Sequence, residues 1–196
     1  MNIAIFASGS GSNARKIMEY FQDDPDVRVS LVVSNKKDAG VLDIAREHSI
    51  PTHIIDRKSF YDTQDLLGVL ERYGVGFVVL AGFLWYVPAY LVQAFPGRMV
   101  NIHPALLPKY GGKGMFGRHV HEAVRAGGES VTGITVHLVN EHYDEGDILF
   151  QATCPVAPED TPEDIARKVQ QLEHRHFPAV IAGMLHAPAE PAPGKD

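Results

Sequence analysis

The sequence contains only one cysteine, Cys154, among 196 residues. A single thiol excludes an intramolecular disulfide framework, fits a reducing compartment and leaves no cysteine set for a zinc site. No membrane span is visible at the start of the chain, where the apolar stretch 3–7 is far too short to cross a bilayer. That start also lacks the basic residues of a signal peptide, so we expect a cytoplasmic protein without a membrane partner.

The chain also has few basic residues: 24 acidic side chains outnumber 18 basic ones, and the formal net charge is −6. Broad binding to nucleic-acid phosphates needs clustered cations, so we expect no nucleic-acid partner. An anionic small molecule stays compatible with this charge, because a local site can be positive on an acidic protein. The length predicts a single domain over residues 1–186, followed by a disordered Pro/Ala-rich tail over residues 187–196.

Short apolar runs alternate with helical patterns in the first half of the chain, which predicts a parallel sheet covered on both faces. Strands are expected at 3–7, 27–33, 52–55, 77–81 and 99–103, and helices at 14–21, 41–48, 60–72 and 89–95. A long loop over 105–117 then precedes a helix at 119–126, strands at 130–139 and 148–156, and a last long helix capped by Thr161. The expected fold is α/β: a Rossmann-like open, mostly parallel twisted sheet with helices on both faces and an antiparallel C-terminal strand pair.

Asn101 and His103 lie two residues apart at the end of the strand at 99–103, just before Pro104. Side chains two apart on a strand leave the same face, and a proline stops the sheet ladder. In open α/β sheets, ligands bind at this carboxyl end. An asparagine N–H can hold a developing oxyanion and a histidine can carry a proton near neutral pH. Taken alone, however, such residues more often cap a strand or form a turn.

A Gly/Ser-rich turn, residues 8–13, joins the first predicted strand to the first helix. Glycines let the backbone approach an anion closely, and the helix N-terminus presents free N–H groups to it. The turn lacks the spacing of the dinucleotide fingerprint and the lysine of the Walker loop, and no acidic residue ends the second strand. We therefore favour a phosphomonoester over a nicotinamide cofactor; the alternative is a tight turn with a Ser or Asn cap.

Two loops have both a structural and a functional interpretation. The apolar segment 83–88 follows a strand, so it either packs in the core or lines a pocket for a flat ring. Asp144 lies in the acidic loop 140–147, where turn chemistry is a sufficient explanation. Its functional interpretation is a position beside His103, whose pKa the carboxylate would raise.

Two pairs of polar residues lie on predicted helices. His119 and His121 lack a carboxylate-and-histidine set at ligand spacing, so we expect ordinary surface histidines and no metal site. Gln170 and Glu173 lie three residues apart on one face of the last helix. Contact with solvent is the usual role of such a pair.

Together these motifs resemble the phosphoribosylglycinamide formyltransferase family, a branch of the folate-dependent formyltransferase superfamily. The resemblance covers residues 1 to about 184 and rests on five stretches: 9–13, 80–83, 101–104, 106–108 and the loop around Asp144. The Asn-x-His-Pro element with a later Asp-x-Gly is shared by the wider superfamily. The early Gly-Ser-Asn loop and the short single-domain chain point to the glycinamide branch.

The resemblance implies formyl transfer from 10-formyltetrahydrofolate, a co-substrate, to the amine of 5'-phosphoribosylglycinamide in purine biosynthesis, with neither metal nor nicotinamide. The implied catalytic residues are Asn101, His103 and Asp144. The implied ribotide-binding residues are Gly11, Ser12, Asn13, Gln170 and Glu173. The implied folate-binding residues are Leu84, Trp85, Tyr86, Val87, Asn101, Val139, Asn140, Glu141 and Asp144. The partners would be small molecules, and the chain a monomer or homodimer.

Two departures from the family pattern are visible, and other functions stay open. Family members often have Met-Arg where this chain has Leu84 and Trp85, so a contact from that arginine is absent. The loop over 109–118 is also longer than in many relatives. The rival functions are a 10-formyltetrahydrofolate hydrolase, a formyltransferase for another amine, and a non-catalytic phosphate- or nucleotide-binding module.

Overall fold

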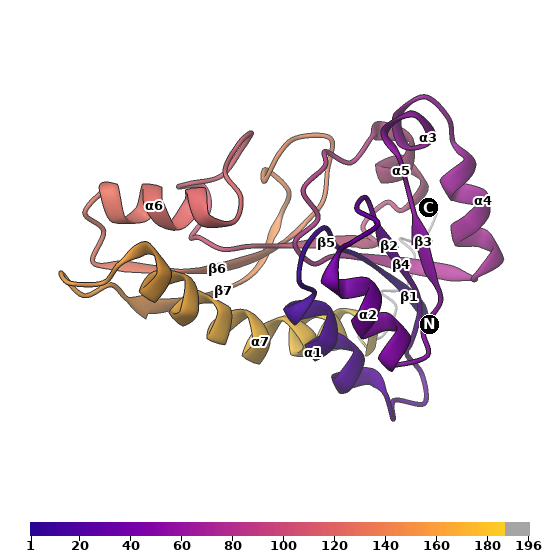
Figure 1. The fold of residues 1–196 in the computed structure, drawn as a ribbon, viewed down its shortest axis with the longest axis horizontal. Helices are drawn as coiled ribbons and strands as arrows, with labels where there is room; N and C mark the ends of the chain where they lie inside the picture. The colour runs from indigo at the N-terminus through magenta and orange to yellow at the C-terminus, as the bar shows by residue number, and fades with distance from the viewer. Residues whose placement is uncertain (187–196) are drawn as a thin grey trace, which may run out of the picture.

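One seven-stranded sheet, in the order β3-β2-β1-β4-β5-β6-β7, runs through the molecule (Figure 1). Its parallel strands are β1 (Asn2–Phe6), β2 (Arg28–Ser34), β3 (Thr52–Ile54), β4 (Val75–Leu80) and β5 (Met99–His103). The antiparallel strands are β6 (Val131–Leu138) and β7 (Ile148–Pro155). The computed structural model describes residues 1–186, so the tail predicted over residues 187–196 lies outside the described part. The predicted fold class is confirmed.

Alternation along the buried strands creates one apolar core on each face of the sheet. Ile3 and Ile5 of β1 belong to one core and Ala4 and Phe6 to the other, because successive side chains point to opposite faces. The helices of the first core are α1 (Ser12–Phe21), α2 (Gly40–Glu47), α6 (Arg118–Ala126) and α7 (Pro162–His186). The helices of the second core are α3 (Arg57–Tyr61), α4 (Asp65–Arg72) and α5 (Ala89–Ala94). Both faces are therefore covered, as the apolar strands require.

The structure differs from the prediction where a single helix was expected over 60–72. Two helices, α3 and α4, occupy this region instead. The side chain of Asp56 caps α3 by accepting the N–H of Ser59. The Thr63 hydroxyl then donates to the carbonyl of Ser59 and accepts the N–H of Asp65. The Thr63 hydroxyl thus replaces backbone hydrogen-bond partners at this point, so α3 ends and α4 begins here. The other predicted elements agree with the structure to within two residues.

The sheet order brings the loops of the predicted site together. β1, β4 and β5 are neighbouring parallel strands, so the loops that follow their carboxyl ends meet at one edge of the sheet. The antiparallel strand β6 pairs with β5 so that His137 lies opposite Asn101 and Thr135 opposite His103. On the same side, α7 packs along α1. The site is thus built from segments far apart in the sequence.

The turn between β1 and α1 depends on Gly11, the N-cap of α1. Its φ of 80° lies in the left-handed region. A Cβ on this residue would lie only 2.7 Å from the Cα of Val41, in α2. Because α2 packs directly against the turn, a side chain at this position has no space.

We expect Gly11→Ala to lower the free energy of unfolding by at least about 1–2 kcal/mol, because a left-handed conformation is strained for a residue with a Cβ. Urea denaturation measures this change. Gly9→Ala is the matched control, since a Cβ on Gly9 has no atom within 4 Å and its φ is not left-handed. Equal losses in the two variants would contradict the prediction.

Candidate active site

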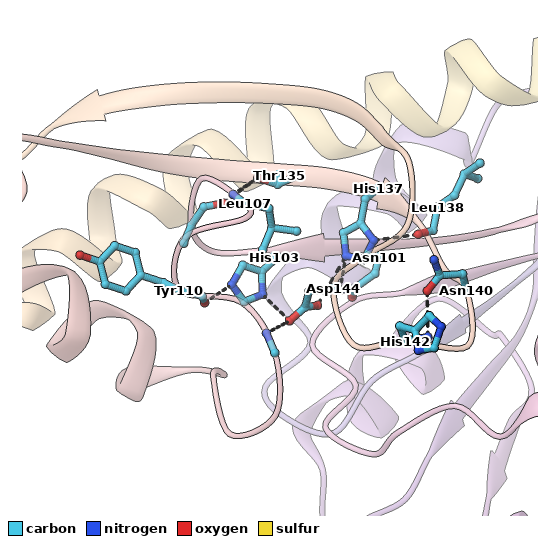
Figure 2. Close-up of polar contacts among 12 residues, drawn as sticks. Asn101, His103, Leu107, Tyr110, Thr135, His137, Leu138, Asn140, His142 and Asp144 are labelled. Atoms are coloured by element: carbon cyan, nitrogen blue, oxygen red, sulfur yellow. Dashed lines mark hydrogen bonds and ion pairs between the residues drawn. The ribbon is translucent and has the colours of Figure 1, made fainter.

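A cavity of about 870 Å³ opens at the carboxyl edge of the sheet. Its walls come from the turn after β1, the loop after β4, the ends of β5 and β6, the glycine-rich loop 112–117, α6 and α7. Asn101, His103 and Asp144 all line it, so the three predicted catalytic residues meet in one place (Figure 2). The predicted geometry of Asn101 and His103, on one face of a strand end, is therefore the observed one.

His137 is the side chain that contacts Asn101. The Nδ1 of His137 lies 2.8 Å from the carbonyl of Leu138, and since a carbonyl only accepts, this nitrogen carries the hydrogen. In the neutral ring the Nε2 is then an acceptor, and it lies 3.1 Å from the Nδ2 of Asn101, which donates to it. His137 is only 2% exposed. Sequence reasoning missed this residue.

His103 is held between a carbonyl and a carboxylate. Its Nε2 donates to the carbonyl of Tyr110 at 2.7 Å, and its Nδ1 lies 3.6 Å from the Oδ2 of Asp144. Burial lowers the pKa of His103 below its ordinary value, more than the Asp144 charge and the Tyr110 carbonyl raise it. Asp144 acts in the predicted direction, but the predicted net rise is wrong, because the side chain is only 3% exposed. The lowered pKa favours the neutral form of His103 near neutral pH.

Asp144 lies between the two imidazoles in Figure 2. Its Oδ2 accepts the N–H of Gly112 at 2.9 Å, and its Oδ1 lies 3.6 Å from the Nε2 of His137. Burial raises the pKa of Asp144, but hydrogen bonding and positive charge from protonated forms of His137 and His103, together with the Gly112 N–H, outweigh it and bring the pKa below its ordinary value. The residue also has a left-handed φ of 55°. Asp144 therefore forms part of a turn and also lies beside His103, so both interpretations of this residue apply.

The turn after β1 is tied to α7 by two side-chain hydrogen bonds. Asn13 Nδ2 donates to Glu173 Oε2 at 2.9 Å, and Gln170 Nε2 donates to Ser12 Oγ at 3.2 Å. Burial raises the pKa of Glu173, partly opposed by the Asn13 hydrogen bond. Asn13, Gln170 and Glu173 line the cavity, whereas Gly11 and Ser12 do not. The pair on α7 thus faces α1 rather than only solvent.

The predicted folate residues lie along the cavity with one exception. Those that line it are Leu84, Trp85, Tyr86, Val87, Asn101, Val139, Asn140 and Asp144. Glu141 does not line it: its carboxylate accepts from Gln93 Nε2 at 2.9 Å, and its carbonyl accepts from the Tyr86 hydroxyl. This residue joins the loop after β6 to α5 and to the loop after β4.

For the apolar segment 83–88 the sequence left two alternatives open, packing in the core and lining a pocket, and Trp85 does both. Its ring packs with those of Phe60, Tyr61 and Phe83 at centroid distances of 5.7, 6.0 and 6.4 Å. The guanidinium of Arg57 lies 5.6 Å from the ring centroid. Trp85 also lines the cavity. Core packing and pocket lining are therefore combined in this side chain.

His121 differs from the predicted surface histidine. It is 7% exposed and lines the cavity, and its Nδ1 has no hydrogen-bond partner among the described residues. The residue lies on the inner face of α6 with Val120 and Val124. Burial, and secondarily His103, lower the pKa of His121. His119 is exposed, as predicted.

Residues 1–186 contain neither a metal-binding cluster nor a membrane-crossing helix. These residues contain no group of three His, Cys, Asp or Glu side chains placed to hold a metal ion. None of the helices in the same part of the chain is both long enough and apolar enough to cross a membrane.

An amide donor, a buried histidine and a carboxylate surround a cavity at the carboxyl edge of an open α/β sheet. Such groups can stabilise an oxyanion and move a proton, as acyl transfer requires. The chain belongs to the formyl transferase family, whose model matches residues 1–181. The resemblance inferred from the sequence motifs is thereby confirmed.

Three relatives define the similarity more closely. The chloroplastic phosphoribosylglycinamide formyltransferase of Arabidopsis thaliana is 45% identical, with 93% of this chain and 64% of the relative covered. This chain therefore spans less than two thirds of that relative's length. The phosphoribosylglycinamide formyltransferase of Escherichia coli (strain K12) is 37% identical, with 93% and 86% covered. The crystal structure of the Bacillus halodurans phosphoribosylglycinamide formyltransferase is similar at a TM-score of 0.85 and 36% identity, with 95% and 96% covered.

We expect Asp144→Asn to lower the pKa of His103 further, because the carboxylate is the main influence that opposes burial. NMR titration of the imidazole signals measures this pKa. Asparagine tolerates the left-handed conformation of residue 144, so the variant should fold. Asp147→Asn, an exposed position in the same loop, is the control and should leave the pKa unchanged. A wild-type His103 that titrates above about 6.5 would contradict the assignment.

Proposed function

We propose that this chain transfers the formyl group of 10-formyltetrahydrofolate to the amine of 5'-phosphoribosylglycinamide. The products are formylglycinamide ribonucleotide and tetrahydrofolate, and the reaction belongs to purine biosynthesis. The names of the similar proteins and membership of the formyl transferase family support this substrate pair. The observation that carries the proposal is the meeting of Asn101, His103 and Asp144 in a single cavity.

The turn after β1 is the proposed site of the ribotide. The N-terminus of α1 offers free N–H groups to the phosphate, and the left-handed Gly11 forms the turn that precedes it. Ser12 and Asn13 contribute polar side chains, and Gln170 and Glu173 of α7 complete the site. These contacts are polar and local, which suits a phosphomonoester on a protein of net charge −6.

The proposed folate site is the remainder of the cavity. The whole cavity, of about 870 Å³, is within the usual range for small-molecule pockets. Apolar residues 84–87 offer contacts to a flat ring, and the loop from Val139 to Asp144 offers backbone and side-chain polar groups. This combination fits a pterin, which has a flat ring with a hydrogen-bonding edge.

The amine of the ribotide adds to the formyl carbon, and the carbonyl electrons move onto the oxygen. Asn101 stabilises this oxygen with an N–H, because the Nδ2 has two hydrogens and His137 takes only one. Neutral His103 removes the proton from the new ammonium. Its Nδ1 takes this proton, since its Nε2–H is already donated to Tyr110. Asp144 stabilises the imidazolium, which returns the proton to the folate nitrogen as the carbon–nitrogen bond breaks.

Absorbance of the folate product formed from 10-formyltetrahydrofolate, with and without the ribotide, tests the proposal. We expect product only with the ribotide, and a loss of about 10²–10³ in turnover for Asn101→Ala, since one oxyanion donor is removed. We expect His103→Ala to abolish transfer. Near-wild-type turnover in a folded Asn101→Ala protein would refute the catalytic assignment. Product without the ribotide would favour the hydrolase, and no product in either case would favour another amine or a binding module.

We expect Asn13→Asp to raise the KM for the ribotide about 10- to 100-fold, because a second carboxylate replaces a donor to Glu173 and would face the phosphate. The KM for the folate should stay within about twofold, since the change is at the other substrate. Steady-state kinetics with each substrate varied in turn separates the two constants. An equal rise in both would argue against a ribotide site at this turn.

The proposal also covers the cellular location and the oligomeric state of the protein. We propose a cytoplasmic enzyme that works on small molecules as a monomer or homodimer. The Arabidopsis thaliana relative, in contrast, is named chloroplastic. Light scattering of the purified chain gives its mass in solution and distinguishes the two assemblies.

A further inference from the structure

His137 is a polar side chain of the cavity that the proposed reaction does not use. It projects from β6, a strand that pairs antiparallel with β5, and lies directly opposite Asn101 in the register. It is 2% exposed and lines the same cavity as Asn101 and Asp144. An apolar residue at this position would fill the space without a polar atom to satisfy. Both nitrogens of the buried imidazole instead have polar partners, Asn101 and the carbonyl of Leu138, which suggests a specific role.

Two contacts of the imidazole define one tautomer. The carbonyl of Leu138 requires a hydrogen on Nδ1, so Nε2 of the neutral ring has a lone pair. This lone pair faces the Nδ2 of Asn101 at 3.1 Å. A flipped amide would instead place the Oδ1 of Asn101 against the lone pair, and two acceptors would repel. The carboxylate of Asp144, whose Oδ1 lies 3.6 Å from the same Nε2, also disfavours an oxygen at that point.

We propose that His137 is a positioning residue that holds the amide of Asn101 in the orientation with its N–H groups available. One hydrogen of Nδ2 goes to His137, and the second is then directed by the planarity of the amide to the reacting oxygen. Without this acceptor the amide is free to turn and present its oxygen, which repels an oxyanion. His137 acts through Asn101 and touches no reacting atom. The inference rests on the proposed function, in which Asn101 is the oxyanion donor.

Two substitutions separate the two nitrogens of the ring. His137→Gln keeps an acceptor oxygen near the position of Nε2, whereas His137→Asn is shorter and keeps polar atoms only near Nδ1. We expect His137→Asn to lower kcat about 10- to 100-fold with the KM of both substrates within about threefold, and His137→Gln to recover most of the loss. His53→Asn, the same change on strand β3 outside the site, is the control. Equal losses of kcat in the Asn and Gln variants would overturn the proposal.

A double-mutant cycle tests whether the effect passes through Asn101. If it does, adding His137→Asn to Asn101→Ala lowers kcat no further than about twofold. A merely structural role would give losses that multiply, and this outcome would overturn the proposal. Thermal melting of each variant identifies any that fails to fold.

Nitrogen-15 NMR of the protein without substrates tests the geometry independently of the reaction. We expect the hydrogen of the His137 ring on Nδ1 with a lone pair on Nε2, and a shift of the Asn101 side-chain NH₂ signal in His137→Asn but not in His53→Asn. A hydrogen on Nε2 of His137 would overturn the proposal. If the wild-type protein transfers no formyl group to the ribotide, the proposed function fails, while these spectra still decide whether His137 orients Asn101.

Discussion

The antiparallel pairing of β5 with β6 is the constraint on which the site depends. It places Thr135 and His137 opposite His103 and Asn101, so each polar residue of one strand has a polar neighbour on the other. The Thr135 hydroxyl donates to the carbonyl of Ala105 and accepts the N–H of Leu107, which holds the chain just after His103. A slip of one residue would send all these side chains to the opposite face. The register therefore determines which residues meet.

Burial influences the protonation of the residues that the strand pairing brings together. Removal from water favours the neutral form of a histidine, and for His103 this effect exceeds the attraction of Asp144. The pKa of the same carboxylate lies below its ordinary value, and the N–H of Gly112 donates a hydrogen bond to it. A neutral base next to a fixed negative charge is suited to accept a proton during a reaction and to return it.

Residues far apart in the sequence meet at the proposed ribotide site. Asn13 and Glu173 are 160 positions apart in the sequence, yet their side chains share a hydrogen bond. The long helix α7 makes this contact because its apolar residues, among them Ile165 and Val169, pack into the core that also covers α1. Its N-terminus is set by Thr161 and Asp164, whose side chains each accept the other's backbone N–H. Packing of the apolar face of α7 thus places Gln170 and Glu173 at the cavity.

Local pattern was sufficient for the fold class, the strand end at Asn101 and His103 and the Gly/Ser turn, because periodicity, proline and glycine act on neighbouring residues. It failed for the helix over 60–72, where a hydroxyl competes with the backbone, and for His121 and His137, whose environment is made by other strands and helices. His137 had a visible signal: on strand 130–139 it lies with Thr135 on the face opposite Ile134 and Val136. The sequence by itself determined which elements form and what chemistry they offer. Only the tertiary structure decided the neighbours and the pKa of His103, because burial and charge act through space rather than along the chain.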